Sequence, residues 1–324
     1  MINLTQTVTA KIPRNEQLMV GLVLAFLFLF ILLFLLNLFI AKLRKQSIYY
    51  KKIGYVVLLW SLILCLFGIG IKTIYQSNMW SLQTSILKPI QSYERQKTDH
   101  AADQDKTSRA EIAKMVMRQA NSGLDKQGFV SIPERNILLP IYNNAYSDKG
   151  LNAGADYANR SADDPEGKNI PVMGQGNYGL AAHNFNDGIT GFSGLQQETN
   201  HDLPYLQNDK LKGSNWLNGK TVLLANAQGI YDYQITGQTL VTPDAVSVLN
   251  SNQSAEVTII SCLFPSTDYR IITHATLRKT YTWSSAPQKL VKEFNLKVKN
   301  TNAHVSWWNP GVEEGANGDK GGTT

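Results

Sequence analysis

The sequence predicts a mainly β protein: one closed or nearly closed barrel with short helices, preceded by two transmembrane helices. Two observations support this. Two long apolar runs near the N-terminus flank a basic loop. Seven or eight short strand patterns, separated by Gly, Asn, Asp and Pro turns, follow from residue 128 with no long helix between them. With 324 residues, the chain is long enough for one or two domains with a real core.

The N-terminal region has the pattern of a membrane anchor. Residues 18–41 are apolar apart from Asn37, and residues 53–71 form a second uncharged run. The first run exceeds the roughly 20 residues needed to span a bilayer. Five Lys/Arg and no acidic residue lie between the runs, which predicts a cytoplasmic loop with both termini outside.

Two alternatives for these runs are weaker. A cleaved signal peptide would have an apolar core of about 7–15 residues, and the run 18–41 is longer than that. It would also have a small-residue cleavage site, and none follows residue 41. A buried core helix does not account for the basic residues that flank the second run. We therefore expect a protein of the cell membrane with an extracellular domain.

The net charge of +6 does not indicate a nucleic-acid partner. Residues 1–72 hold eight Lys/Arg and one Glu, whereas residues 73–324 hold 23 Lys/Arg and 24 Asp/Glu. The basic excess thus belongs to the anchor, and the rest of the chain has no basic surplus to bind nucleic acid.

The chain has two cysteines, Cys65 in the second apolar run and Cys262 in the exterior part. The bilayer would separate them, so no disulfide is expected. A lone exterior thiol is either inert and buried or a nucleophile. A zinc site built on cysteines is excluded because no second ligand cysteine is available.

Little regular secondary structure is expected between the anchor and the barrel. Tyr75 and Trp80 suit the membrane interface. Residues 91–110 are polar and read as a linker or mobile helix, and 110–120 as a short helix carrying Ile112, Met115 and Met117.

The barrel strands follow in order. Pro140 favours an edge position for its strand, and residues 151–157 predict a short helix or turn. Residues 221–225 and 229–235 predict a hairpin whose second strand alternates two faces. The full set of predicted strands is 129–132, 137–142, 178–183, 221–225, 229–235, 257–262 and 270–277.

Beyond Trp283 the patterns weaken. Residues 289–298 predict an extra strand or helix, and the Trp-Trp-Asn-Pro of 307–310 is either a docking anchor or a chance cluster. Residues 311–324 are Gly-rich and polar, and we expect the end of the chain to be disordered.

Three residues could together perform acyl transfer. Cys262 ends a buried strand, Arg270 begins the next, and His183 ends an earlier one. A thiolate is the nucleophile, histidine can protonate a leaving amine, and arginine can hold an oxyanion. Each has an ordinary structural alternative, and His274 competes with His183. His100, His201 and His304 lie in polar or terminal segments without chemical context.

Two motifs resemble those of sortases. Thr258-Ile259-Ile260-Ser261-Cys262, with Arg270 downstream, is similar to their Thr-Leu-x-Thr-Cys strand and following arginine. The segment 176–184, Gly-Asn-Tyr-Gly-Leu-Ala-Ala-His-Asn, is similar to their histidine strand. The resemblance covers roughly residues 128–280. The departures, Ile259 for leucine, Ser261 for threonine and Ala182 for glycine, leave the reacting atoms unchanged.

The resemblance implies an eight-stranded sortase-type barrel and a cysteine transpeptidase that anchors surface proteins to the cell wall. Cys262 would be the nucleophile, His183 the acid/base and Arg270 the stabiliser. The thiolate would cleave a Leu-Pro-x-Thr-Gly-like signal between Thr and Gly. The implied partners are secreted proteins with a C-terminal sorting signal, the amine of a peptidoglycan precursor and membrane lipid.

A housekeeping, class A-like enzyme is favoured over a pilus-polymerising sortase, because Asp164-Pro165 is followed by Glu166 rather than an aromatic residue and the C-terminus is polar. The two predicted N-terminal spans depart from the single anchor common in that class. No cofactor is expected. Some class A enzymes bind calcium through acidic loops, but Asp163, Asp164 and Glu166 do not match that site clearly, and a solvated loop is favoured.

Two other functions remain open on the residues alone: a membrane-anchored cysteine peptidase that releases its acyl-enzyme to water, and a non-catalytic exterior binding module. The expected organisation is an exterior segment (1–17), a two-helix anchor (18–72), a stalk with a short helix (73–127), the catalytic domain (128–285) and a C-terminal extension (286–324).

Overall fold

The structure, a computed structural model, describes residue 42 and residues 50–322. Described residues up to Tyr75 belong to one compact unit and those from Gln76 onward to another. In the first unit, helix α2 (Tyr50–Gln76) contains the one described segment, Leu59–Gln76, that is long and apolar enough to cross a membrane. The predicted run 53–71 falls in this helix. The predicted run 18–41 lies outside the described residues, so the two-span anchor stays a prediction.

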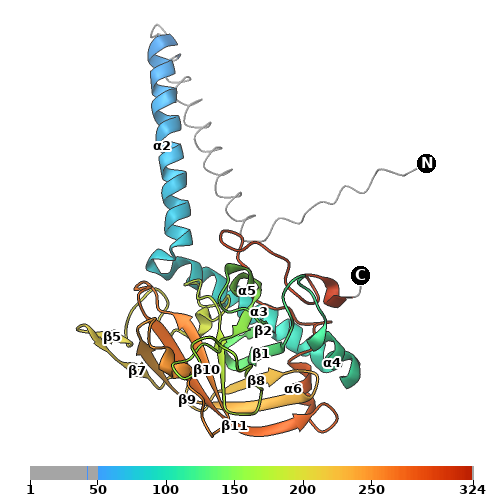
Figure 1. Ribbon diagram of the computed structural model, residues 1–324. Coiled ribbons are helices and arrows are strands. Elements are labelled where there is room, and N and C mark those ends of the chain that lie inside the picture. The colour runs from blue at the N-terminus through green and yellow to red at the C-terminus, as the bar shows by residue number, and fades with distance from the viewer. Residues whose placement is uncertain (1–41, 43–49, 323–324) are drawn as a thin grey trace. The chain divides into compact units, whose positions relative to one another are not determined.

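The second unit is built on a closed barrel of eight strands (Figure 1). The strand order is β11-β10-β4-β3-β2-β1-β8-β9, and β11 also pairs with β9, which closes the ring. This confirms the predicted barrel. The strands are β1 (Gly128–Ile132), β2 (Ile137–Tyr142), β3 (Ala155–Tyr157), β4 (Asn177–Ala181), β8 (Thr221–Ala225), β9 (Gly229–Val241), β10 (Glu256–Cys262) and β11 (Arg270–Thr282), with three two-residue strands outside the ring: β5 (Leu206–Gln207), β6 (Lys210–Leu211) and β7 (Gly213–Ser214).

The alternation of the sequence sets which side chains fill the barrel. Along β9, Tyr231, Tyr233 and Ile235 belong to the interior cluster, while Ile230 faces outward into a second cluster with α4. The predicted hairpin of β8 and β9 is present, with Leu224 opposite Tyr231. Each buried aliphatic or aromatic side chain of this kind stabilises the fold by roughly 1.5–3 kcal/mol.

Two of the neighbouring strand pairs are parallel, β2 with β3 and β4 with β10. The edge position predicted from Pro140 is wrong, because β2 lies inside the sheet with β1 on its other side. The ladder between β2 and β3 begins only at Ile141, opposite Ala155. Pro140 therefore faces no β3 residue across the sheet, which explains how a residue without an N–H is accommodated there.

Helices surround the barrel. Ser108 and Glu111 form a capping box that begins α4, and α4 buries Ile112, Met115 and Val116. The helices of this unit are η1 (Met79–Ser81), α3 (Leu82–Gln104), α4 (Arg109–Met117), η2 (Pro133–Arg135), α5 (Asp148–Ala153), η3 (Ser193–Leu195), η4 (Val246–Leu249), α6 (Gln288–Lys292) and η5 (Lys320–Gly322).

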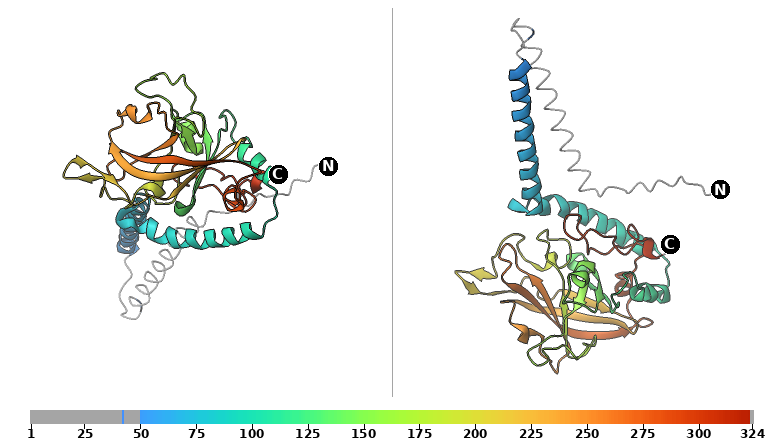
Figure 2. Two further views of the ribbon diagram at one scale, coloured as in Figure 1. Left: turned by 90° about the horizontal axis from the view of Figure 1, so that it is seen from below. Right: turned by 45° about the horizontal axis from the view of Figure 1, so that its top comes forward.

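The segment predicted as a linker or mobile helix lies mostly in α3, which runs along one side of the barrel (Figure 2). The beginning of α3 and the residues just before it are held by buried polar contacts. The Asn78 amide donates to the Asn186 carbonyl at 2.5 Å, and the Thr84 hydroxyl donates to the Asp187 carbonyl at 3.1 Å. The chain before the barrel thus contacts the loop that follows His183.

The C-terminal extension packs on the barrel. Phe294 and Leu296 are buried in the second cluster, and Ala303 joins the interior cluster. The backbone N–H of Asn302 donates to the Leu138 carbonyl on β2 at 3.2 Å. The structure describes the chain as far as Gly322, so most of the stretch expected to be disordered has a described conformation.

Candidate active site

His183 lies two residues beyond the end of β4, and Cys262 is the last residue of the adjacent parallel strand β10. In the ladder between β4 and β10, Ala181 is opposite Ile260. Two residues further along each strand come His183 and Cys262. The Ala182 N–H donates to the Ile260 carbonyl at 3.3 Å, and the Asn184 side-chain amide donates to the Cys262 carbonyl at 2.8 Å. Hydrogen bonds on both sides of His183 therefore hold its backbone beside the cysteine.

Alternation places the candidate residues on one face of the sheet. Leu180, Ala182 and Ile259 face the barrel interior, so His183 and Cys262, which differ from them by odd steps, face outward. Arg270 is opposite Cys262 in the antiparallel ladder of β10 and β11. Directly opposed residues share a face, so all three candidates lie on the outer surface of the barrel.

The imidazole of His183 is half-buried and lies close to one amide and two aromatic side chains. Its Nε2 lies 3.1 Å from Oδ1 of Asn152 on α5. The Phe185 ring is 5.4 Å away between centroids and the Trp308 ring 6.4 Å away, both edge-on. Burial lowers the pKa of His183, and the charge of Asp148 partly opposes this shift.

The Cys262 thiol is partly exposed, and burial raises its pKa, with the Arg270 guanidinium opposing the shift. Nη1 of Arg270 donates to the carbonyls of Thr267 and Tyr269 at 2.8 and 3.0 Å. The arginine is thus anchored to its own loop beside the cysteine.

A clamp of two buried amides fixes the residues around Cys262; we call it the Asn184–Gln196 clamp. Asn184 donates to Oε1 of Gln196 at 2.8 Å as well as to the Cys262 carbonyl. Gln196 in turn accepts from the Phe264 N–H at 3.0 Å and donates to the Phe264 carbonyl at 2.6 Å. Residues on both sides of Leu263 are therefore tied to the histidine loop.

Residues 130–278 match the family model described as the sortase domain. The chain contains a sortase domain. The chain is 26% identical to Sortase A of Streptococcus agalactiae over 256 residues, covering 75% of this chain and 94% of that protein. It is 28% identical to Sortase A of Bacillus anthracis over 186 residues, covering 56% and 73%. A solved structure of Listeria monocytogenes sortase A is 22% identical, with 52% of this chain and 96% of that chain covered and a TM-score of 0.40.

Within the sortase domain, His274 is separated from the cysteine end of the sheet. It pairs with Thr258, four residues along the ladder from the pair of Cys262 and Arg270. At about 3.3 Å per residue, this displaces it by about 13 Å along the strand. Its Nε2 lies 3.2 Å from the Thr239 hydroxyl. Of the two histidines that compete on the sequence, His183 is the one next to Cys262.

The acidic loop considered for calcium has internal partners. Oδ2 of Asp164 accepts from the backbone and side chain of Asn169 at 2.7 and 2.9 Å, and Glu166 pairs with Lys168 at 2.7 Å. Among the residues that the structure describes, no group of three or more acidic, His or Cys side chains is arranged to hold a metal.

Sequence reasoning missed three residues near the histidine: Asn152, Trp308 and Asn309. The Trp-Trp-Asn-Pro stretch was a signal for the last two, but nothing local links residue 308 to residue 183. Asn152 lies in a six-residue helix that begins after Ser147, whose hydroxyl accepts from the Gly150 N–H. Only the fold brings this helix beside the sortase domain's histidine.

Proposed function

We propose that this protein is a class A-like sortase, a cysteine transpeptidase with Cys262 as nucleophile, His183 as acid/base and Arg270 as stabiliser. The observation that carries the proposal is the juxtaposition of His183 and Cys262 at neighbouring parallel strand ends, inside a sortase domain. The relatives named Sortase A support the class assignment over a pilus-polymerising enzyme.

The first half-reaction forms a thioester. The Cys262 thiolate attacks the threonine carbonyl of a Leu-Pro-x-Thr-Gly-like signal, and Nε and Nη2 of Arg270 donate to the developing oxyanion. Because Asn152 accepts a hydrogen bond from Nε2, the neutral imidazole carries its proton there and Nδ1 handles the transferred proton. As the C–N bond breaks, the imidazolium gives a proton from Nδ1 to the departing glycine amine.

The second half-reaction makes the new amide bond. The amine of a peptidoglycan precursor attacks the thioester carbonyl, His183 accepts its proton, and the C–S bond breaks to restore the thiolate. Localisation at the outer face of the cell membrane, through α2 and the predicted first span, would bring the secreted substrate and this amine together. In the competing peptidase function, water takes the place of the amine.

Substitution of the nucleophile tests the mechanism. In the full chain held in detergent, Cys262→Ala should reduce both cleavage of a Leu-Pro-x-Thr-Gly peptide and transfer to triglycine to the uncatalysed background, as measured by mass spectrometry of products. Cys65→Ala is the matched control, and it should keep wild-type activity because it changes the other free thiol. Retained transfer in Cys262→Ala would disprove the mechanism, and hydrolysis alone in the wild type would favour the peptidase.

A further inference from the structure

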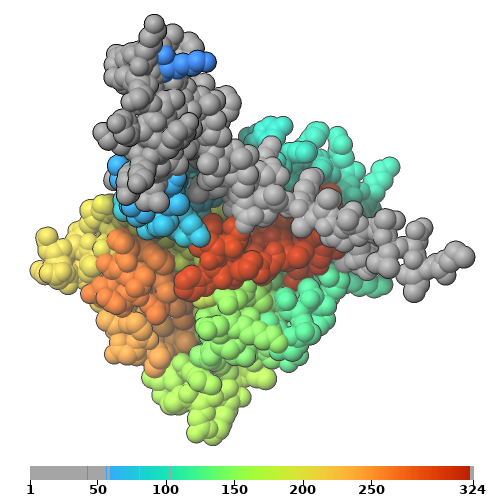
Figure 3. Space-filling view, turned by 90° about the horizontal axis from the view of Figure 1, so that it is seen from above, coloured from blue at the N-terminus to red at the C-terminus, as the bar shows by residue number. Residues whose placement is uncertain are grey.

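The C-terminal extension is tied to the barrel on both sides of Trp308. Before it, the Asn302 side chain accepts from the Leu138 N–H at 2.9 Å, and its carbonyl accepts from the Gly191 N–H at 2.8 Å. After it, Glu314 is buried and bonded to Lys126 at 2.7 Å. Figure 3 shows the extension in red on the surface, bordered by the orange β10–β11 region and the lime region after α5.

Asn309 fixes the position of its neighbour Trp308. The Asn309 side chain is buried, with Nδ2 donating to the carbonyls of Ala303 and Asn152 at 2.8 and 2.9 Å and Oδ1 accepting from the Val305 N–H at 2.9 Å. The same Asn152 holds Nε2 of His183. The extension and the histidine therefore share one anchoring residue, so Trp308 has a built location rather than a chance one.

The histidine has one buried and one exposed aromatic ring near it. The Phe185 side chain is 9% exposed, whereas the Trp308 side chain is 66% exposed and is open to solvent near the imidazole. Because the Trp308 side chain is largely exposed beside the imidazole, most of its indole surface is free to contact a ligand.

The chemistry of the second half-reaction requires an amine at this place. His183 must take a proton from the incoming amine, and the exposed Trp308 ring, with its centroid 6.4 Å from that of the imidazole, lies where such an amine can contact it. An alkylamine arrives as an ammonium ion, and the face of an indole attracts an ammonium ion within about 6 Å. We propose that Trp308 is a specificity-determining residue that binds the ammonium group of the acceptor before His183 deprotonates it.

This inference rests on the proposed transpeptidase function, and the experiment separates the two. Full chains in detergent, wild type and variants, react with a Leu-Pro-x-Thr-Gly peptide without amine, with triglycine, and with hydroxylamine, which is largely uncharged at neutral pH. Mass spectrometry measures the ratio of transfer to hydrolysis. For Trp308→Ala we expect this ratio to fall about three- to tenfold with triglycine and to stay unchanged with hydroxylamine.

The controls isolate the aromatic face. Trp308→Phe should recover most of the triglycine ratio. Val312→Ala, which shortens another exposed apolar side chain of the extension, should leave all three reactions at wild-type rates. Amine-free hydrolysis by Trp308→Ala should stay within about twofold of wild type, since thioester formation precedes the acceptor.

Three results would overturn the proposal. An unchanged triglycine ratio in Trp308→Ala would remove the acceptor role. An equal loss with triglycine and hydroxylamine would assign Trp308 to histidine placement instead. Faster amine-free hydrolysis in Trp308→Ala would indicate instead that the extension shields Cys262 from water. A wild-type chain that transfers the peptide to no amine would contradict the proposed function itself.

Discussion

At the residue scale, burial acts on the thiol and the imidazole in opposite directions. It raises the pKa of Cys262 and lowers the pKa of His183, so both groups favour their neutral forms at neutral pH. The proposed reactive pair, the Cys262 thiolate with the His183 imidazolium, is then a minor species, most populated at pH values between the two pKa values. We infer that the charge of Arg270, opposite Cys262, partly offsets this burial effect.

Removal of that charge should shift the thiol titration upward. In Arg270→Ala the thiolate loses a nearby cation, so the pKa of Cys262 should rise further and the cleavage rate at neutral pH should fall about tenfold or more. Alkylation of Cys262 by iodoacetamide as a function of pH measures the shift. Arg270→Lys, which keeps a cation, should restore most of the wild-type pKa but less of the rate, because lysine lacks the planar fork. A pKa of Cys262 in Arg270→Ala that is equal to or lower than the wild-type value would refute this account.

At the element scale, the Asn184–Gln196 clamp joins the histidine loop to the end of β10. Asn184→Ala removes the donor to the Cys262 carbonyl, and we expect about 1–3 kcal/mol of lost stability together with a lower kcat. The intrinsic reactivity of Cys262 toward iodoacetamide should persist, because the thiol environment is kept. Urea unfolding and steady-state cleavage measure the two effects.

Asn186→Ala is the matched control for the clamp. Asn186 is a buried amide of the same loop, but its side chain donates to the Ser77 carbonyl and to Asn200 rather than to the cysteine strand. It should lose similar stability with a much smaller effect on kcat. Equal kcat losses in the two variants would assign the effect to general loosening of the loop.

Local patterns predicted the strands because each strand has its own alternation of apolar and polar residues and is bounded by turn residues. Val257 to Cys262 and Arg270 onward could be placed from such patterns, and so could the order of histidine, cysteine and arginine. The identity of their neighbours could not. Asn152 and Trp308 contact His183 only because the barrel closes, and no pattern within a window of residues encodes a contact across such separations.

At the whole-molecule scale, the same limit applies to the C-terminal end. Gly-rich, polar composition predicted disorder after residue 311, yet Glu314 is 5% exposed. Its partner Lys126 lies 188 positions earlier in the chain. The composition of a segment indicates how much apolar surface it can bury by itself. It does not indicate that one carboxylate, Glu314, pairs with a lysine elsewhere in the chain. The extension's placement therefore depends on a tertiary contact.

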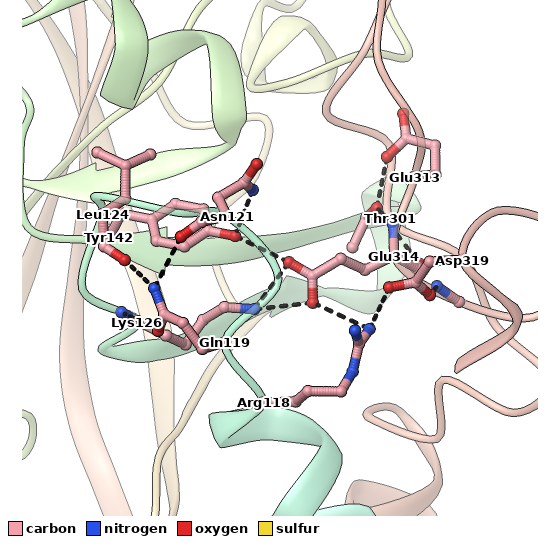
Figure 4. A network of polar contacts seen from close by, with 11 residues as sticks. Arg118, Gln119, Asn121, Leu124, Lys126, Tyr142, Thr301, Glu313, Glu314 and Asp319 are labelled. Carbon is pink, nitrogen blue, oxygen red and sulfur yellow. Dashed lines mark hydrogen bonds and ion pairs between the residues drawn. The ribbon is translucent and has the colours of Figure 1, made fainter. Parts of the chain in front are cut away.

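That contact is the centre of a buried network (Figure 4). Lys126 Nζ lies 2.7 and 2.8 Å from the two carboxylate oxygens of Glu314, and the Tyr142 hydroxyl donates to Oε1 at 2.9 Å. Arg118 reaches Oε2 at 3.7 Å and also pairs with Asp319. The Lys126 ammonium additionally lies 4.5 Å from the centroid of the Phe129 ring. The network joins β1, β2 and the segment after α4 to the extension.

Breaking this pair should destabilise the sortase domain and release the extension. Glu314→Leu leaves the Lys126 ammonium buried without its partner, which typically costs about 3–5 kcal/mol. Replacing both residues, Lys126→Met with Glu314→Leu, removes both charges and should recover most of that stability, since an apolar pair avoids desolvating ions. Urea unfolding of the full chain in detergent, monitored by near-ultraviolet circular dichroism, measures both values.

The same variants connect the network to the active site. If Glu314 holds the extension in place, Glu314→Leu should show the triglycine defect of Trp308→Ala under conditions where the barrel remains folded, and the double variant should transfer more efficiently than the single one. If the free energy of unfolding of Glu314→Leu lies within about 1 kcal/mol of the wild-type value, the attraction between Lys126 and Glu314 does little more than offset the cost of desolvating the two charges. A stable fold with normal transfer in Glu314→Leu would mean that Asn302 and Asn309 alone suffice to hold Trp308 beside the histidine.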